Sequence, residues 1–185
     1  ENRSQYCGWG GTAIGAVRQG GFNPWDDDID IGMVRRDYER FLKVAAHWKP
    51  EKYGVLNAET DPRMPLCTTR WVLRGTRFQE ECFQDLDCEW GIFLDIFCFD
   101  NIPDDNRVMK RQAWAAWFYG KMMILASIDR PVLYFGGWKA KLVYFLCKIA
   151  HKWLKLLHLD SAFWYRKAKR IIVKYRHVKT KRVAF

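Results

Sequence analysis

The sequence lacks the patterns that bind structural zinc or span a membrane. Its six cysteines include no Cys-x-x-Cys pair, and the nearest two, Cys82 and Cys88, do not have the spacing of a zinc knuckle. No apolar run is long enough to cross a bilayer, and we identify no secretory signal. We therefore expect reduced, mostly buried cysteines in a cytoplasmic protein.

Acidic residues are nearly absent from the C-terminal part of the chain. Residues 138–185 contain 14 Lys and Arg and one acidic residue, Asp160, whereas residues 1–137 contain 17 basic and 20 acidic residues. The basic charge therefore belongs to the C-terminal part. No nucleic-acid-binding motif accompanies it, so we expect no nucleic acid partner. The four histidines fall on predicted helices and receive no catalytic role: His47, His151, His158 and His177.

Length and composition indicate a globular protein of the size of one domain. The chain has 185 residues, of which 49% are hydrophobic and 28% charged. That balance excludes disordered and fibrous classes and is enough for a single good core.

The most informative stretch places Asp26, Asp27, Asp28 and Asp30 within five residues. It continues into an alternation of apolar and polar residues over 29–33, which predicts a strand. On a strand Asp28 and Asp30 would share one face, where two carboxylates raise each other's pKa unless a cation lies between them. A hard divalent ion with oxygen ligands would remove that cost. The alternative is a solvent-facing acidic strand end.

A third carboxylate, Asp95, interrupts the apolar run of residues 92–97. Asp rarely lies in such surroundings unless it is paired or binds a metal ion. The alternative is a buried Asp that accepts hydrogen bonds from backbone amides.

Upstream of the acidic stretch, Gly10, Gly11 and Thr12 precede a predicted helix over 13–19. Free amides at a helix N-terminus bind phosphate, and glycines let the backbone come close to it. We therefore interpret these three residues as a phosphate-binding turn. The alternative is a tight strand-to-helix turn with Thr12 as N-cap.

Two further side chains are candidates for substrate binding. Arg18 would lie about two turns along the predicted helix, and it would reach either a phosphate or the Asp cluster. Trp25 would stack on a base or simply form the floor of the site, since large aromatic residues usually belong to the core.

Together these segments resemble the LicD family. The matching segments are GGTAIGAVR (10–18), GF (21–22), PWDDDIDIGM (24–33), DYERF (37–41) and GIFLDIF (91–97). Family members resemble bacterial phosphorylcholine transferases and, more distantly, fukutin-related protein, within the nucleotidyltransferase superfamily. The composite motif is much more specific than any short pattern.

The resemblance implies a reaction and a set of roles. Phosphocholine, or a similar phosphoalcohol, would move from CDP-choline or a related CDP-alcohol to a hydroxyl of a cell-surface glycan, such as a teichoic acid or lipopolysaccharide precursor, lipid-linked in some cases. Asp28 and Asp30 would hold Mg²⁺, with Mn²⁺ as a substitute. Asp95 would complete the metal site or act as general base.

The resemblance and the patterns together predict an α+β fold. We expect a nucleotidyltransferase-like mixed β-sheet core with flanking helices in residues 1–105, and a basic helical region packed on it in residues 106–185. The expected strands are 4–9, 29–33, 53–56, 66–73, 77–83 and 91–99, and the expected helices are 13–19, 36–47, 107–127, 138–159 and 161–175.

The basic helices of the C-terminal half are amphipathic. Such helices suit an anionic membrane surface, which would place the protein peripherally at the inner face of the membrane. The alternative is a helical subdomain with ordinary solvated lysines.

Two other functions remain open at this level. The same three carboxylates would serve a metal-dependent nucleotidyltransferase that uses an NTP. The second is an inactive chain that binds a polyanion or membrane through its basic helices. In such a chain we would expect one of the three carboxylates to be lost, but Asp28, Asp30 and Asp95 are all present.

Overall fold

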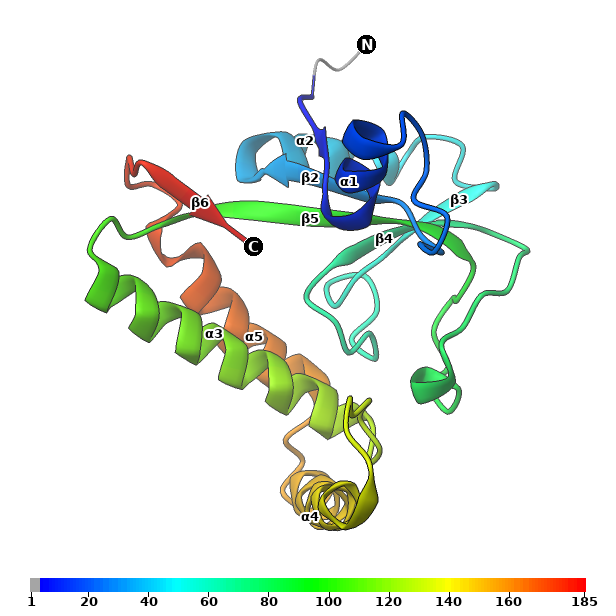
Figure 1. Ribbon diagram of the computed structural model, residues 1–185, viewed down its shortest axis with the longest axis vertical. Helices are drawn as coiled ribbons and strands as arrows, with labels where there is room; N and C mark the ends of the chain where they lie inside the picture. Colours follow the sequence, from blue (N-terminus) through cyan, green and yellow to red (C-terminus); the bar gives the residue numbers. More distant parts are fainter. Residues whose placement is uncertain (1–3) are drawn as a thin grey trace.

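The protein is built around one mixed sheet, seen in the computed structural model, which describes residues 4–185 (Figure 1). Residues 1–3 of the predicted core region 1–105 lie outside this range. The strands lie in the order β1-β2-β5-β4-β3, and β6 pairs with β5 off this path. The bounds are β1 Cys7–Gly8, β2 Asp30–Val34, β3 Tyr53–Leu56, β4 Thr69–Leu73, β5 Ile92–Ile102 and β6 Arg182–Ala184.

Strand β5 is the centre of this sheet. It runs parallel to β2 on one side and antiparallel to β4 on the other. Nearly continuous apolar residues suit a strand that is covered on both faces, and Ile96 in its middle is fully buried. One apolar cluster forms around Met33, Tyr38 and Ile96, and a second around Val72, Phe83 and Trp90.

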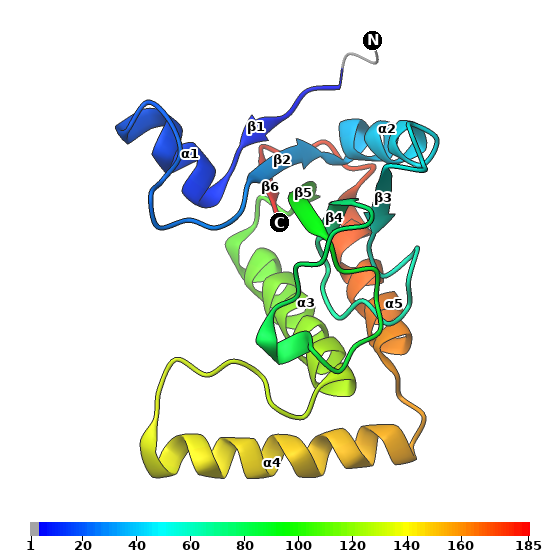
Figure 2. The same ribbon diagram turned by 90° about the vertical axis from the view of Figure 1, so that its right-hand side faces the viewer.

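Within residues 4–185, five α-helices surround or extend the sheet: α1 Gly10–Arg18, α2 Arg35–Ala45, α3 Asn106–Ser127, α4 Gly137–Leu156 and α5 Ser161–Ile172. Asp105 caps α3 by accepting hydrogen bonds from the amides of Arg107 and Val108. Helices α3 and α5 lie side by side, and α4 crosses beyond their ends at the side of the molecule farthest from α1 (Figure 2).

The end of the described chain returns to the sheet. Strand β6 pairs antiparallel with the last residues of β5, with Asp100 opposite Ala184. On the same part of β5, the buried Asp100 accepts two hydrogen bonds from the Arg35 guanidinium at the start of α2, at 2.9 and 2.5 Å. This bidentate pair fixes the β2–α2 junction against β5.

The predicted fold class is confirmed: a mixed sheet with flanking helices and a helical C-terminal half. The predicted strand over 77–83 is wrong. That segment is irregular and ends in a 3₁₀ turn, Glu81–Phe83. Its polar side chains are used in local contacts instead: Gln79 donates to the carbonyls of Phe83 and Leu86, and Glu80 accepts from Arg70. The first strand is shorter than expected, and β6 was not predicted. The division at residue 105 coincides with the β5–α3 junction but stays a prediction.

Within residues 4–185, no helix has the length and apolar character needed to cross a membrane. All six cysteines in this range are free thiols. Five are partly buried and Cys7 is exposed, so the expectation of mostly buried cysteines was too strong.

Candidate active site

Two carboxylates that are close in sequence, Asp28 and Asp30, meet the distant Asp95 at one end of the β2–β5 pair. Asp30 on β2 lies opposite Asp95 on β5 in the parallel register. Asp28, Asp30 and Asp95 each offer an oxygen within 4.8 Å of the other two. The predicted set therefore converges. Asp28 is not on the strand as predicted, since β2 begins at Asp30 and Asp28 lies in the bend before it.

The N-terminus of α1 lies against this cluster. The first hydrogen bond of the helix runs from the Ala13 amide to the Trp9 carbonyl at 3.1 Å, so the amides of Gly10, Gly11 and Thr12 precede the helical ladder. Gly10 has φ +52°, and a Cβ there would lie 2.7 Å from Asp30 Oδ2. A Cβ at Gly11 would lie 1.6 Å from Asp26 Oδ2. Only glycine permits this approach.

Helix α1 begins three residues earlier than predicted, which changes the role of Thr12. The Thr12 hydroxyl accepts a hydrogen bond from the Asp30 amide at 2.9 Å, and Trp9 occupies the N-cap position. The N-cap interpretation of Thr12 is therefore wrong. Instead, Thr12 ties the start of α1 to the start of β2.

The cluster is electrostatically unfavourable without a cation. Burial and the neighbouring carboxylates Asp28 and Asp26 raise the pKa of Asp30 to about 6. Burial, opposed by Arg70 and reinforced by Asp28 and Asp30, raises the pKa of Asp95 to about 6. The pKa of Asp28 is raised by burial and by Asp26 and Asp27. Like charges held this close favour a proton or a metal ion between them.

The donor set fits Mg²⁺ or Mn²⁺. All three converging groups are carboxylates, the hard oxygen ligands that Mg²⁺ takes alongside substrate phosphates. Next to them, Asp26 Oδ2 is buried at Gly11 and has no hydrogen-bond partner among the described residues. A buried carboxylate oxygen without a donor is consistent with a place for positive charge.

Arg70 is a member of the site that the sequence did not single out. On β4 it lies opposite Asp95 of β5, and its Nε donates to Asp95 Oδ1 at 3.3 Å. Its Nη2 donates to Glu80 at 2.5 Å, and its guanidinium lies 3.9 Å from the centre of the Phe93 ring. It is only 4% exposed, and Nη1 is buried without a partner among the described residues.

The signal for Arg70 was present in the strand pattern. Arg70 alternates with Trp71 and shares a face of β4 with Val72, which is buried. A charged residue at a position of the buried face must be paired, and the sequence could not show that its partners lie on β5 and in the following loop.

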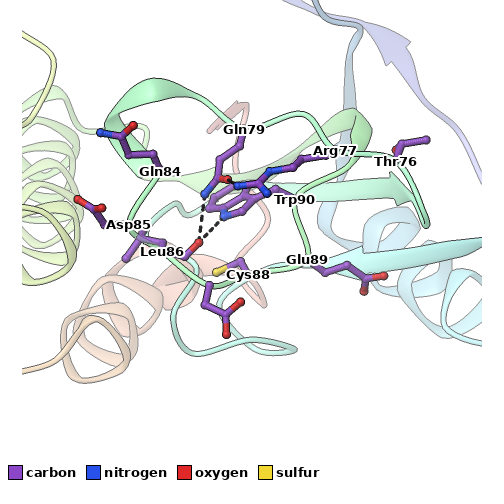
Figure 3. A pocket seen from close by; sticks show the side chains of 10 residues that line it. Thr76, Arg77, Gln79, Gln84, Asp85, Leu86, Cys88, Glu89 and Trp90 are labelled. Carbon is purple, nitrogen blue, oxygen red and sulfur yellow. Dashed lines mark hydrogen bonds between the residues drawn. The ribbon is translucent and has the colours of Figure 1, made fainter.

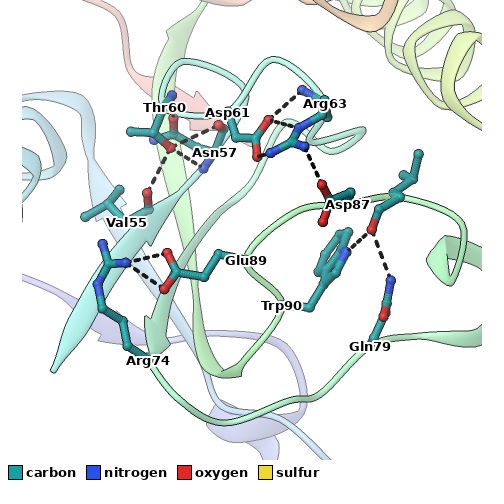
Figure 4. A network of polar contacts seen from close by, with 11 residues as sticks. Val55, Asn57, Thr60, Asp61, Arg63, Arg74, Gln79, Asp87, Glu89 and Trp90 are labelled. Carbon is teal, nitrogen blue, oxygen red and sulfur yellow. Dashed lines mark hydrogen bonds and ion pairs between the residues drawn. The ribbon is translucent and has the colours of Figure 1, made fainter. Parts of the chain in front are cut away.

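The loop between β4 and β5 delivers Glu80 to Arg70. Gln79 Nε2 donates to the carbonyls of Phe83 and Leu86, and the Trp90 indole donates to Leu86 at 2.8 Å (Figure 4). Ion pairs anchor the outside of the loop: Arg74 with Glu89, and Arg63 with Asp87.

An open cavity of about 350 Å³ lies along the same loop, where Arg77, Gln79 and Trp90 gather (Figure 3). None of the three clustered carboxylates lines it. It is therefore separate from the carboxylate cluster.

The other two predicted residues lie outside the cluster. Arg18 is exposed in the last turn of α1, about 12 Å along the helix axis from Gly10 at 1.5 Å per residue. Trp25 is 83% exposed, so it is not a core residue. Its ring is free for a ligand, and its role in binding stays a prediction.

Comparison with known proteins agrees with this geometry. The family described as LicD/FKTN/FKRP, nucleotidyltransferase domain, matches residues 4–124. The matched region contains the converging carboxylates, the N-terminus of α1 and Arg70, so it defines a nucleotidyltransferase domain. This chain belongs to the LicD family.

Two curated relatives are similar over part of the chain. Lipopolysaccharide cholinephosphotransferase LicD of Haemophilus influenzae is 34% identical over 100 residues, covering 54% of this chain and 37% of that protein. Uncharacterized protein RT0683 of Rickettsia typhi is 36% identical over 55 residues, covering 30% of this chain and 18% of that protein. The matches thus span well under half of each relative. No solved structure matches.

Proposed function

We propose that this chain transfers phosphocholine, or a similar phosphoalcohol, from a CDP-linked donor to a hydroxyl of a cell-surface glycan precursor. The carrying observation is the convergence of Asp28, Asp30 and Asp95 at the N-terminus of α1. Membership of the LicD family and similarity to a protein named lipopolysaccharide cholinephosphotransferase support the choice of reaction.

In this proposal Asp28 and Asp30 hold Mg²⁺, or Mn²⁺ in its place, against the donor diphosphate. A divalent ion supplies charge neutralisation of the phosphates. The amides of Gly10, Gly11 and Thr12 bind phosphate oxygens at the positive end of the α1 dipole.

Asp95 faces the acceptor hydroxyl. As the acceptor oxygen bonds to the phosphorus of phosphocholine, the bond from that phosphorus to CMP breaks, and the hydroxyl proton passes to the Asp95 carboxylate. Arg70, which is itself held by Glu80, donates to Asp95 and holds it in place. Holding a second metal ion is the other role that fits Asp95. Most of the rate enhancement comes from positioning and fixed charge.

The remaining parts of the proposal concern binding and location. In this proposal the exposed Trp25 stacks on the cytosine base. Arg18 contributes only if a substrate extends along α1. A cytoplasmic location at the inner face of the membrane stays a prediction.

Isothermal titration of CDP-choline with Mg²⁺ into the wild type and into Asp28→Ala/Asp30→Ala tests the proposal. We expect magnesium-dependent binding that the double variant loses. Binding of CTP or ATP, but not of CDP-choline, would instead favour nucleotidyl transfer to an acceptor by attack on an α-phosphate. That second function draws support from the family's nucleotidyltransferase domain. No nucleotide binding at all would support the inactive alternative.

A further inference from the structure

We propose that α4 is a membrane-docking helix that lies flat on an anionic bilayer. One side of α4 packs on the rest of the protein through Ala140, His151 and Leu154. The His151 ring donates through Nδ1 to the Leu125 carbonyl of α3 at 2.7 Å. The opposite side faces away from the molecule, at its lower edge in Figure 2.

That outer side is apolar. At 100° per residue, seven large apolar residues fall within an arc of about 100°. Trp138, Phe145 and Leu156 are the most exposed of them, at 71%, 61% and 68%. We call these seven the apolar face of α4: Trp138, Leu142, Phe145, Leu146, Ile149, Trp153 and Leu156.

Basic residues border this face. Four lysines fall within the adjoining arc of about 60°, and we call them the lysine flank: Lys141, Lys148, Lys152 and Lys155. Lys139 lies on the other border, and residues 137–156 contain no acidic residue. The segment that leads into α4 adds the exposed Tyr134 and Phe135.

The charges decide which partner this face fits. A second copy of α4 would bring one lysine flank against another, and like charges in contact disfavour such a dimer. A bilayer of anionic lipid offers an apolar interior to the apolar face and negative headgroups to the flank. Lysines reach headgroups while their methylenes stay on apolar surface, and tryptophans favour the interface. Phe145, Ile149 and Trp153 would enter the bilayer.

Docking through α4 would set the position of the active site. In both views α4 lies at the opposite end of the molecule from α1 (Figures 1 and 2). The carboxylate cluster would then face away from the bilayer, toward glycan that projects from a lipid-linked acceptor. This consequence rests on the proposed function, whereas docking itself does not.

Co-sedimentation of the full chain with vesicles tests the proposal. We expect binding to phosphatidylcholine vesicles with 30% phosphatidylglycerol (roughly the level at which a basic surface responds to anionic lipid), falling at high salt, and at least tenfold weaker binding to pure phosphatidylcholine. Lys148→Gln/Lys152→Gln should weaken binding about tenfold. Its matched control on α3, Lys110→Gln/Lys121→Gln, should stay within about twofold of the wild type.

The apolar face has its own variant, Phe145→Gln/Ile149→Gln/Trp153→Gln. It should fold, because all three side chains are exposed, and lose at least tenfold in vesicle binding. Trp114→Gln on α3, also exposed, is the control. Wild-type binding to neither vesicle, or face-variant binding equal to the wild type, would overturn the proposal. So would sedimentation velocity showing a dimer that the face variant dissolves. If CDP-choline does not bind but vesicle binding is retained, the proposed function is wrong and the docking proposal stands.

Discussion

The carboxylate cluster and the lysine flank both gather charges of one sign, but in opposite physical settings. Asp28, Asp30 and Asp95 are fixed by the ends of paired strands and by the bend before β2, so they cannot move apart. The lysines of α4 extend from one exposed helix face into water, where each is solvated separately.

Because of this difference, the carboxylate cluster and the lysine flank suit different kinds of charged partner. The raised pKa values of Asp30 and Asp95 express repulsion that a compact multivalent cation relieves. Solvated lysines carry little such repulsion, and their charge is spread along about 20 Å of helix, which suits an extended surface. The rigid carboxylate cluster therefore favours a small cation, and the exposed lysine flank favours an extended anionic surface.

The largest expected effect comes from removing one clustered carboxylate. Asp30→Asn should lower phosphocholine transfer roughly 10³-fold, because it deletes a charge that the metal–diphosphate complex needs. Initial rates with CDP-choline and a glycan acceptor measure the effect. Glu51→Gln, at an exposed site between α2 and β3, should stay within about twofold. Equal transfer rates for Asp30→Asn and Glu51→Gln would show that the clustered carboxylate takes no part in the reaction.

Next in size is the effect of Arg70 on stability. Arg70→Gln leaves Asp95 buried without its ion-pair partner, which costs about 3–5 kcal/mol. At about 2–4 °C per kcal/mol, the Tm should fall by roughly 6–20 °C. Arg74→Gln, four residues further along the chain and just past the end of β4, breaks an exposed pair with Glu89 and should cost below about 1 kcal/mol. Similar losses in both variants would contradict the buried role of Arg70.

Two glycines on helices should respond in opposite directions. Gly11→Ala places a Cβ on the Asp26 carboxylate and should destabilise by about 1–3 kcal/mol. Gly120→Ala in α3 meets nothing within 4 Å and should stabilise by up to about 1 kcal/mol. Thermal unfolding measures the stability of both variants. If Gly11→Ala leaves stability unchanged, the start of α1 and the Asp26 carboxylate are not packed tightly together.

The smallest expected effect is in the pH dependence of metal-free protein. Folded-state pKa values near 6 for Asp30 and Asp95 exceed the ordinary 3.8, so the folded state binds protons more tightly. Their stabilising contribution is fully present below about pH 4 and is lost as pH rises through about 6. Asp95→Asn should therefore flatten this profile between pH 4 and 7, by on the order of 1 kcal/mol. An unchanged profile would locate the titration elsewhere.

Much of this architecture follows from local sequence patterns. The alternation after Asp28, the apolar run around Asp95 and the helical periodicity from Arg107 onward predicted β2, β5 and α3 within a few residues. The glycines before Thr12 predicted a backbone that a phosphate can approach closely; in the structure the Asp30 and Asp26 carboxylates lie there, and phosphate binding stays a prediction. These features are local, so propensity and periodicity suffice.

What the sequence could not show depends on contacts between distant residues. The stretch 77–83 was predicted as a strand, but Gln79 and Glu80 instead bind the carbonyls of Phe83 and Leu86 and the guanidinium of Arg70, which the sequence could not show. Arg70 is part of the site only because β4 pairs with β5. Strand β6 has three residues, too few for a pattern, and it exists because Asp100 to Ile102 offer it an edge.

The pairing of β6 with β5 makes the entire α3–α5 segment an excursion between two neighbouring strands. The entropy of closing such an excursion grows only with the logarithm of its length, so doubling it costs about 0.6 kcal/mol. Helices in this position can therefore lengthen, shorten or change their outer face while the sheet keeps its register. The fold thus leaves the surface of α4 open to variation while the carboxylates of β2 and β5 remain fixed.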